Sequence, residues 1–144
     1  MSQLWWQLVL GGTLIGVATA IQAVTIGIGM MVRPHVSRRI GKFRLGLMSL
    51  VIAVAALWML TGQMLGVWIW SVALLQIGAF TELEPALYFT LSAYTTLGFG
   101  DVLAPDEWRV LGALAGANGM LGFGLATAAL VEFVRRVRED MPSG

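Results

Sequence analysis

The sequence predicts an all-α membrane protein with three transmembrane helices and a short re-entrant helix that leads into a loop. Hydrophobic residues make up 58% of the 144 residues and charged residues 12%, about half the charged share of a soluble domain. A soluble domain of this size cannot bury so many apolar side chains, so lipid is the expected solvent. The charges also leave three long uncharged stretches, and an acidic segment separates the second from the third.

Whole functional classes are excluded at this stage. The chain has no cysteine, which rules out disulfides, thiolate metal sites and cysteine nucleophiles. It also shows no nucleophile–base pair and no cluster of metal-ligating residues, so we do not expect an enzyme.

The first uncharged stretch covers residues 1–32. It is long enough for a transmembrane helix, which needs about 20 apolar residues. A cleaved signal peptide is the alternative, and the small residues at 18–20 resemble a cleavage site. A signal peptide needs a basic region at its start, however, and the first basic residue here is Arg33. We therefore predict an N-terminal transmembrane helix.

Residues 33–44 carry five basic side chains and no acid, and they are predicted to form a basic cytoplasmic loop. The next uncharged stretch, 45–80, is predicted as the outer helix of a pore domain covering 45–135. As one straight helix it would reach roughly 54 Å, against a hydrocarbon core of about 30 Å. It is therefore either one tilted helix or a helix that breaks near Gln63, and two crossings are the competing interpretation.

The distribution of basic residues favours one crossing. The third uncharged stretch, within a predicted inner helix at 108–135, is followed by a second basic cluster at 135–138. If 45–80 crosses once and 81–107 dips in and returns, both basic clusters lie on one side. That side is cytoplasmic by the positive-inside rule. The prediction is a multi-pass protein of the cell (inner) membrane, with its N-terminus outside and a short cytoplasmic tail at 136–144.

A short helix is predicted at 84–95. Pro85 suits a first helical turn, where its missing N–H costs little. Twelve residues are too few to span a bilayer, so the helix should be re-entrant and buried by protein. Its dipole then points the negative end, near Thr95, into the membrane, where a cation is stabilised.

The loop after this helix is the segment with the clearest chemistry. Its residues are Thr96, Leu97, Gly98, Phe99, Gly100 and Asp101. A dehydrated cation needs oxygen ligands, which stacked rings of backbone carbonyls can supply. Gly98 and Gly100 adopt positive φ cheaply, as aiming successive carbonyls at one axis requires. Alone, the two glycines would fit an ordinary turn, but their place between a re-entrant helix and a transmembrane helix favours a selectivity filter at 96–101.

This region resembles the pore module of bacterial two-transmembrane potassium channels, whose filter typically reads TTVGYGD. Here residues 95–101 read TTLGFGD, and Trp108 follows Asp101 by seven residues, as in that family. The stretch 123–130, FGLATAAL, is similar to the family's inner-helix FGLVTAAL. Gly119 matches the glycine at which that helix bends. The resemblance covers roughly 45–135, and small bacterial ion-channel proteins with an extra first helix are the most similar.

The resemblance implies a fold and a function. It implies a homotetramer with tetrameric potassium-channel pore architecture, in which K⁺ is the permeant ligand and the third transmembrane helix lines a cavity. It implies that the ions bind the carbonyls of Thr96, Leu97, Gly98 and Phe99, and the Thr96 hydroxyl. The expected partners are K⁺ ions, membrane lipids and further copies of the chain. No nucleic acid, other cofactor or regulatory domain is expected.

The sequence also departs from the family pattern. Leu97 replaces valine, and Phe99 replaces tyrosine, so it has no hydroxyl to tie the filter to its supporting helix. Ser92 stands where some members have a glutamate that bonds the filter aspartate. The residues expected to support the filter and its outer mouth are Thr95, Asp101, Ser92 and Trp108. A less selective monovalent-cation (Na⁺/K⁺) pore is therefore one alternative, and a non-conducting scaffold or accessory subunit is another.

Three residues of the third transmembrane helix are candidates for a functional or packing role. Gly119 is either a hinge, because glycine weakens a helix locally, or a point of close helix approach. Thr127 and Asn118 are polar in an apolar helix, where polar groups face a bundle interior or water. We expect Thr127 to line a cavity, whereas Asn118 is a candidate to bond a neighbouring helix.

Overall fold

A computed structural model of the chain describes residues 2–39 and 45–139, and every regular element in these ranges is helical. The helices are α1 (Ser2–Arg39), α2 (Leu45–Gln76), α3 (Leu83–Tyr94), the 3₁₀ turn η1 (Asp106–Trp108) and α4 (Arg109–Glu139). Three of them, α1, α2 and α4, are long and apolar enough to cross a membrane. The predicted all-α class with three such helices is thereby confirmed.

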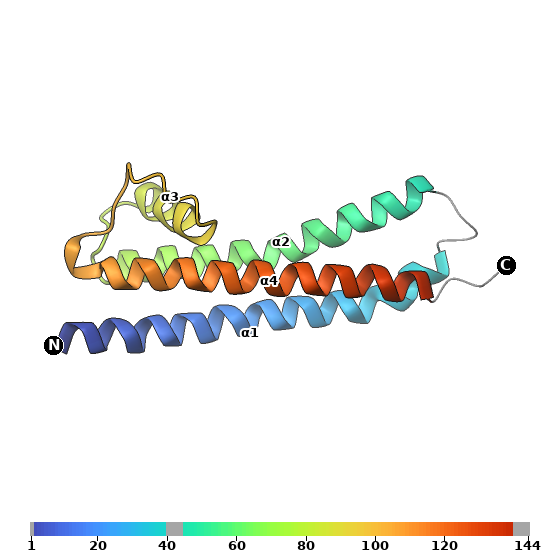
Figure 1. Cartoon of the computed structure of the whole chain (residues 1–144), viewed down its shortest axis with the longest axis horizontal. Helices are drawn as coiled ribbons and strands as arrows, with labels where there is room; N and C mark the ends of the chain where they lie inside the picture. Colours follow the sequence, from blue (N-terminus) through green and yellow to red (C-terminus); the bar gives the residue numbers. More distant parts are fainter. Residues whose placement is uncertain (1, 40–44, 140–144) are drawn as a thin grey trace.

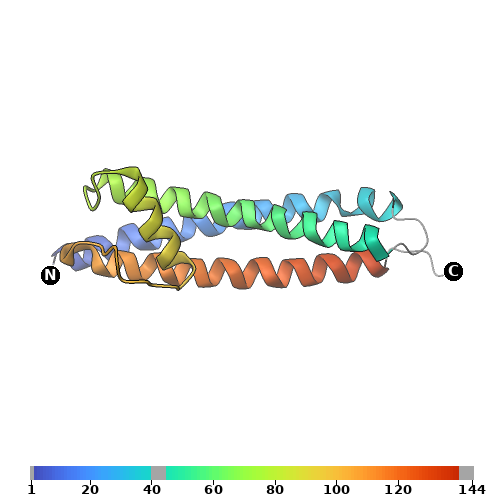
Figure 2. The same ribbon diagram turned by 90° about the horizontal axis from the view of Figure 1, so that it is seen from above.

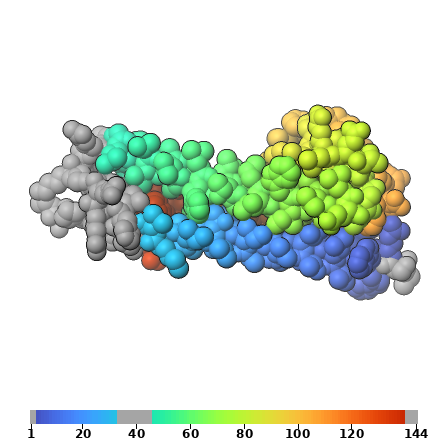
Figure 3. Space-filling view, turned by 180° about the vertical axis from the view of Figure 1, so that it is seen from behind, coloured from blue at the N-terminus to red at the C-terminus, as the bar shows by residue number. Residues whose placement is uncertain are grey.

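The three long helices lie side by side in one bundle, and α3 packs across α2 and α4 at one end (Figures 1 and 2). The N-terminus of α1 lies at this same end, and the C-terminal end of α4 lies at the other (Figure 1). Seen from behind, α1 and α2 cover one face and the α3 region projects beyond them (Figure 3). The larger buried cluster, which includes Trp70, Leu74 and Leu111, lies where α2, α3 and α4 meet.

The second long helix is continuous. The break considered near Gln63 does not occur, because α2 runs unbroken from Leu45 to Gln76. The buried Gln63 side chain instead lies against Gly122 on α4, and Gln22 of α1 lies against Gly62. Polar side chains at this depth sit opposite glycines, which leave room for them between the helices.

The helix α2 ends four residues before the predicted limit of 80. The cause is Gly78, whose φ of 75° lies in the left-handed region. The N–H of Gly78 donates to the Leu75 carbonyl and that of Ala79 donates to the Leu74 carbonyl, at 3.0 Å each. This pattern is a Schellman motif, in which a glycine closes the helix and satisfies its last carbonyls.

Two other predicted boundaries differ from the structure. The basic loop predicted at 33–44 is partly helical, because α1 continues to Arg39. Pro34 removes one backbone hydrogen bond and crowds the preceding turn, yet the helix continues past it to Arg39. The inner helix extends to Glu139 rather than 135, because Arg135 pairs with Glu132 and Glu139 on adjacent turns, which stabilises a helix end.

The first helix is joined to the rest of the bundle by polar contacts near its start and beyond its middle. The Gln7 side-chain carbonyl accepts the backbone N–H of Leu111, at 3.1 Å, in the first turn of α4. Farther along, the indole N–H of Trp58 on α2 donates to the Thr25 carbonyl at 2.9 Å. Gln7 is buried and satisfies one of the N–H groups that every helix start leaves without an intrahelical partner.

Candidate functional site

The short helix α3 sits closely on α4 because α4 presents glycines to it. A Cβ atom at Gly119 would lie 2.6 Å from the carbonyl carbon of Tyr94 and closer still to its oxygen. One at Gly116 would lie 3.2 Å from the Ala93 carbonyl oxygen. Gly119 is therefore a point of close approach between α4 and the end of α3. Close approach was one of the two roles predicted for it, the other being a hinge.

A buried hydrogen-bond centre fixes the same end of α3. The side-chain oxygen of Asn118 on α4 accepts the indole N–H of Trp70 from α2, at 2.8 Å. It also accepts the hydroxyl of Tyr94, the last residue of α3, at 3.2 Å. All three side chains are buried, so one amide joins three helices. This confirms the expectation that Asn118 bonds a neighbouring helix.

In the loop after α3, the sign of the backbone angle φ alternates from one residue to the next. Thr96, Gly98 and Gly100 have φ values of 60°, 55° and 78°, whereas Leu97 and Phe99 are not in the positive region. Thr96 is the one non-glycine residue with positive φ among the described residues. Alternating left- and right-handed residues turn successive N–H groups to one side of a chain and the carbonyls to the other.

Hydrogen bonds to Ser92 show that the N–H groups of the loop face α3. The Gly98 N–H donates to the Ser92 carbonyl at 3.2 Å, and the Phe99 N–H donates to the Ser92 hydroxyl at 3.3 Å. The two groups of a trans peptide point in opposite directions. The carbonyls of Leu97 and Gly98, which share peptides with these N–H groups, therefore point away from α3. They are free to act as cation ligands.

The start of this loop is held by α3 as well. The Thr96 N–H donates to the Ala93 carbonyl at 2.9 Å. Thr95 caps the helix, because its backbone N–H and its hydroxyl both donate to the Leu91 carbonyl, at 2.9 and 2.7 Å. Thr95 and Ser92, both singled out in the sequence, thus make contacts that hold the loop against the helix.

A contact at the outer end of the loop was not foreseen from the sequence. The hydroxyl of Tyr88 on α3 donates to the Asp101 carboxylate at 2.7 Å. This bond stabilises the charged carboxylate, so it lowers the pKa of Asp101 below its ordinary value and raises the pKa of Tyr88.

The side chains of the loop are largely uncovered within one chain. Leu97 and Phe99 are 62% and 65% exposed. Trp108, by contrast, packs against the buried cluster of α2, α3 and α4, and its backbone N–H donates to the Pro105 carbonyl at 2.8 Å. It anchors the return from the loop into α4.

A hollow of about 400 Å³ lies at the inner end of the loop. It is lined by Tyr94, Thr95, Thr96, Met120 and Phe123. Met120 and Phe123 were not predicted, because nothing in their residue type marks a cavity. The predicted cavity residue Thr127 lies instead beside a smaller hollow of about 130 Å³, next to Gln63. Gly119 lines neither.

The described residues contain no cluster of His, Cys, Asp or Glu that could hold a metal ion. The oxygens that residues 96–100 offer are backbone carbonyls and the Thr96 hydroxyl. Neutral oxygens of this kind can replace the water around a monovalent cation.

One of three comparisons with known proteins found a match. A search among curated proteins and a search among solved structures each found no match. A family model described as an ion channel matches residues 57–136. The match begins within α2 and includes α3, the loop and nearly all of α4, which is more than half of the chain. The chain is thus a membrane protein that belongs to the ion channel family.

Proposed function

We propose that four copies of this chain form a potassium-selective pore that conducts K⁺ passively down its electrochemical gradient. Each copy contributes the carbonyls of Thr96, Leu97, Gly98 and Phe99 and the hydroxyl of Thr96. Four such rows around one axis replace the water shell of the ion. The observation that carries the proposal is the pair of N–H groups bonded to Ser92, since it turns the Leu97 and Gly98 carbonyls away from α3.

Other features support the same assembly. The row of carbonyls is one-sided, so a single chain cannot surround an ion. The exposed Leu97 and Phe99 side chains would be covered by adjacent copies. The hollow below Thr96 becomes one quarter of a central cavity, and the negative end of the α3 dipole points towards it, which favours a cation there.

We further propose the orientation. The loop end of the molecule carries acids, Glu82, Glu84 and Asp101 among them, and the last turns of α4 at the opposite end carry Arg135, Arg136 and Arg138. The positive-inside rule then places the basic end in the cytoplasm and the loop outside. In this arrangement α2, α3 and α4 form a pore module of the bacterial two-transmembrane type, and α1 is an additional outer helix.

The test is K⁺ flux from liposomes containing the purified protein, with sodium competition. Gly98→Ala should abolish the flux, because alanine at a φ of 55° costs about 1–2 kcal/mol per subunit and displaces the carbonyls. Gly124→Ala is the matched control, because a Cβ there meets nothing within 4 Å. Both variants should still assemble.

The alternatives predict other outcomes. Equal potassium and sodium permeability in reversal-potential measurements would indicate the weakly selective pore, for which the missing Phe99 hydroxyl is the structural reason. A pure tetramer without barium-blockable current would indicate a scaffold. Normal flux in the Gly98→Ala protein would refute the filter assignment itself.

A further inference from the structure

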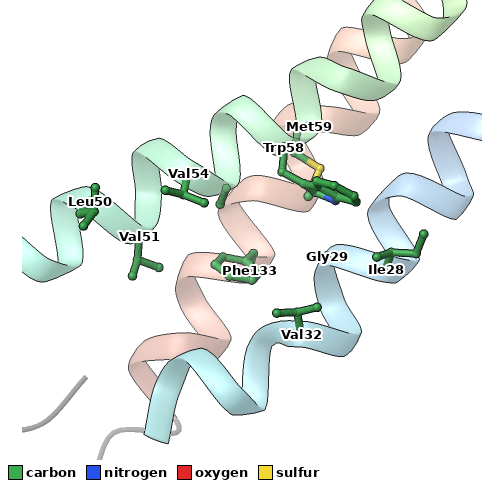
Figure 4. A pocket seen from close by; sticks show the side chains of 10 residues that line it. Ile28, Gly29, Val32, Leu50, Val51, Val54, Trp58, Met59 and Phe133 are labelled. Atoms are coloured by element: carbon green, nitrogen blue, oxygen red, sulfur yellow. The ribbon is translucent and has the colours of Figure 1, made fainter. Parts of the chain in front are cut away.

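An apolar hollow of about 330 Å³ lies between α1, α2 and α4, and Figure 4 shows the side chains that line it. It lies towards the end of the bundle away from the loop after α3, where α1 and α2 diverge (Figure 1). Its floor is buried and consists of Ala55, Met59 and Phe133. Its rim is open and includes Val32 and Val54, which are 51% and 57% exposed. It is large enough to hold a ligand, since small-molecule sites begin at about 300 Å³.

The walls offer nothing to a polar ligand. The one nitrogen among the lining side chains is the indole N–H of Trp58, and it already donates to the Thr25 carbonyl. That bond holds the indole against Gly29, which has no side chain to displace it. The hollow is therefore a preformed apolar site rather than an accidental gap.

The volume of the hollow helps to decide between a helix and a lipid acyl chain as its occupant. One turn of a helix about 11 Å wide and 5.4 Å long occupies roughly 500 Å³, which exceeds the hollow. A transmembrane helix from a second copy therefore cannot fit inside it and would reach it only through single side chains. A flexible hydrocarbon chain can, and in a membrane the open rim faces acyl chains.

Charge at the same end selects the kind of lipid. Arg136 lies one turn beyond Phe133 on α4 and pairs with Glu132, whereas Arg138 makes no ion pair with the described residues. In the sequence, Val32 is followed directly by the segment 33–44, with five basic residues and no acid. Basic clusters beside transmembrane helices attract anionic head groups.

We propose that this hollow binds one acyl chain of an anionic glycerophospholipid, whose head group lies at the basic end of the bundle. The site joins α1 to α2 and to the floor residue Phe133 of α4, so the bound chain fills the gap between the first helix and the pore module. This inference does not depend on conduction or on ion selectivity.

The experiment is native mass spectrometry of the full-length protein, purified with equal amounts of phosphatidylglycerol and phosphatidylcholine. The wild type should retain phosphatidylglycerol preferentially. Val54→Trp places an indole at the rim and should eliminate this retention. Val72→Trp is the matched control, because this valine farther along α2 is also exposed, 41% against 57% for Val54; the protein should retain the lipid.

A second variant tests the head group without altering the hollow. Arg136→Gln combined with Arg138→Gln should lower phosphatidylglycerol retention by roughly tenfold or more, because each basic residue near an anionic surface contributes about fivefold. Phosphatidylcholine retention should stay the same. Equal retention of the two lipids by the wild type, or full phosphatidylglycerol retention by the Val54→Trp protein, would overturn the proposal.

Discussion

Replacing Gly119 by alanine tests whether this glycine is a contact or a hinge. The new Cβ would lie 2.6 Å from the carbonyl carbon of Tyr94, and ordinary contact begins at 3.4 Å. The helices α3 and α4 must therefore separate locally by at least about 0.8 Å. Overpacking of this kind costs about 1–3 kcal/mol, and the neighbours that must move are main-chain atoms, which cannot rotate away as a side chain can.

The loss should appear both in stability and in conduction. We expect the thermal midpoint of the Gly119→Ala assembly in detergent to fall and K⁺ flux to decrease, because the displaced Tyr94 carbonyl immediately precedes the filter loop. The control is Gly124→Ala, which meets no neighbour within 4 Å and gains up to about 1 kcal/mol in helix propensity. If Gly119→Ala matched this control in midpoint and changed only channel opening, the packing argument would be wrong and the hinge role correct.

Three further substitutions address the contacts around the loop. Tyr88→Phe should raise the pKa of Asp101 towards its ordinary value, since that pKa is lowered by the bond; as pH falls, flux should then decline at a higher pH than in the wild type, measured by titrating the outer solution. Asn118→Leu should destabilise the assembly by about 1–3 kcal/mol in thermal unfolding, because two buried donors lose their acceptor. Ser92→Ala removes the acceptor of the Phe99 N–H and should lower potassium-over-sodium selectivity in reversal potentials, whereas unchanged selectivity would show that the remaining backbone bonds suffice.

The sequence was informative where the determining signal is local. Uncharged stretches define transmembrane helices directly, because a charge in lipid is costly. The glycines at 98 and 100 predicted positive φ, and both have it. Pro85 and the polar residues around it located the short helix within one residue of α3. Gly78 carried an equally local signal for the end of α2, and it was missed.

The remaining features depend on which helices meet. Gly119 has the same neighbours in sequence whether it packs or bends, and only the position of α3 distinguishes the two. The bond between Tyr88 and Asp101 joins residues on a helix and a loop whose relative placement is set by the whole bundle. The cavity residue Met120 has no chemical mark of its own, since a methionine in a membrane helix fits lipid, protein or a hollow equally well.

The hydrogen bond from Leu111 to Gln7 changes what counts as the smallest working unit. The family match begins at residue 57, which suggests that the first helix could be removed as an appendage. Yet a truncation starting after that helix would leave a main-chain donor at the head of α4 facing lipid with no acceptor. The side chain of Leu111, fully buried in the intact chain, would lose part of its cover with it. A pore domain prepared alone would begin with a loosened inner helix.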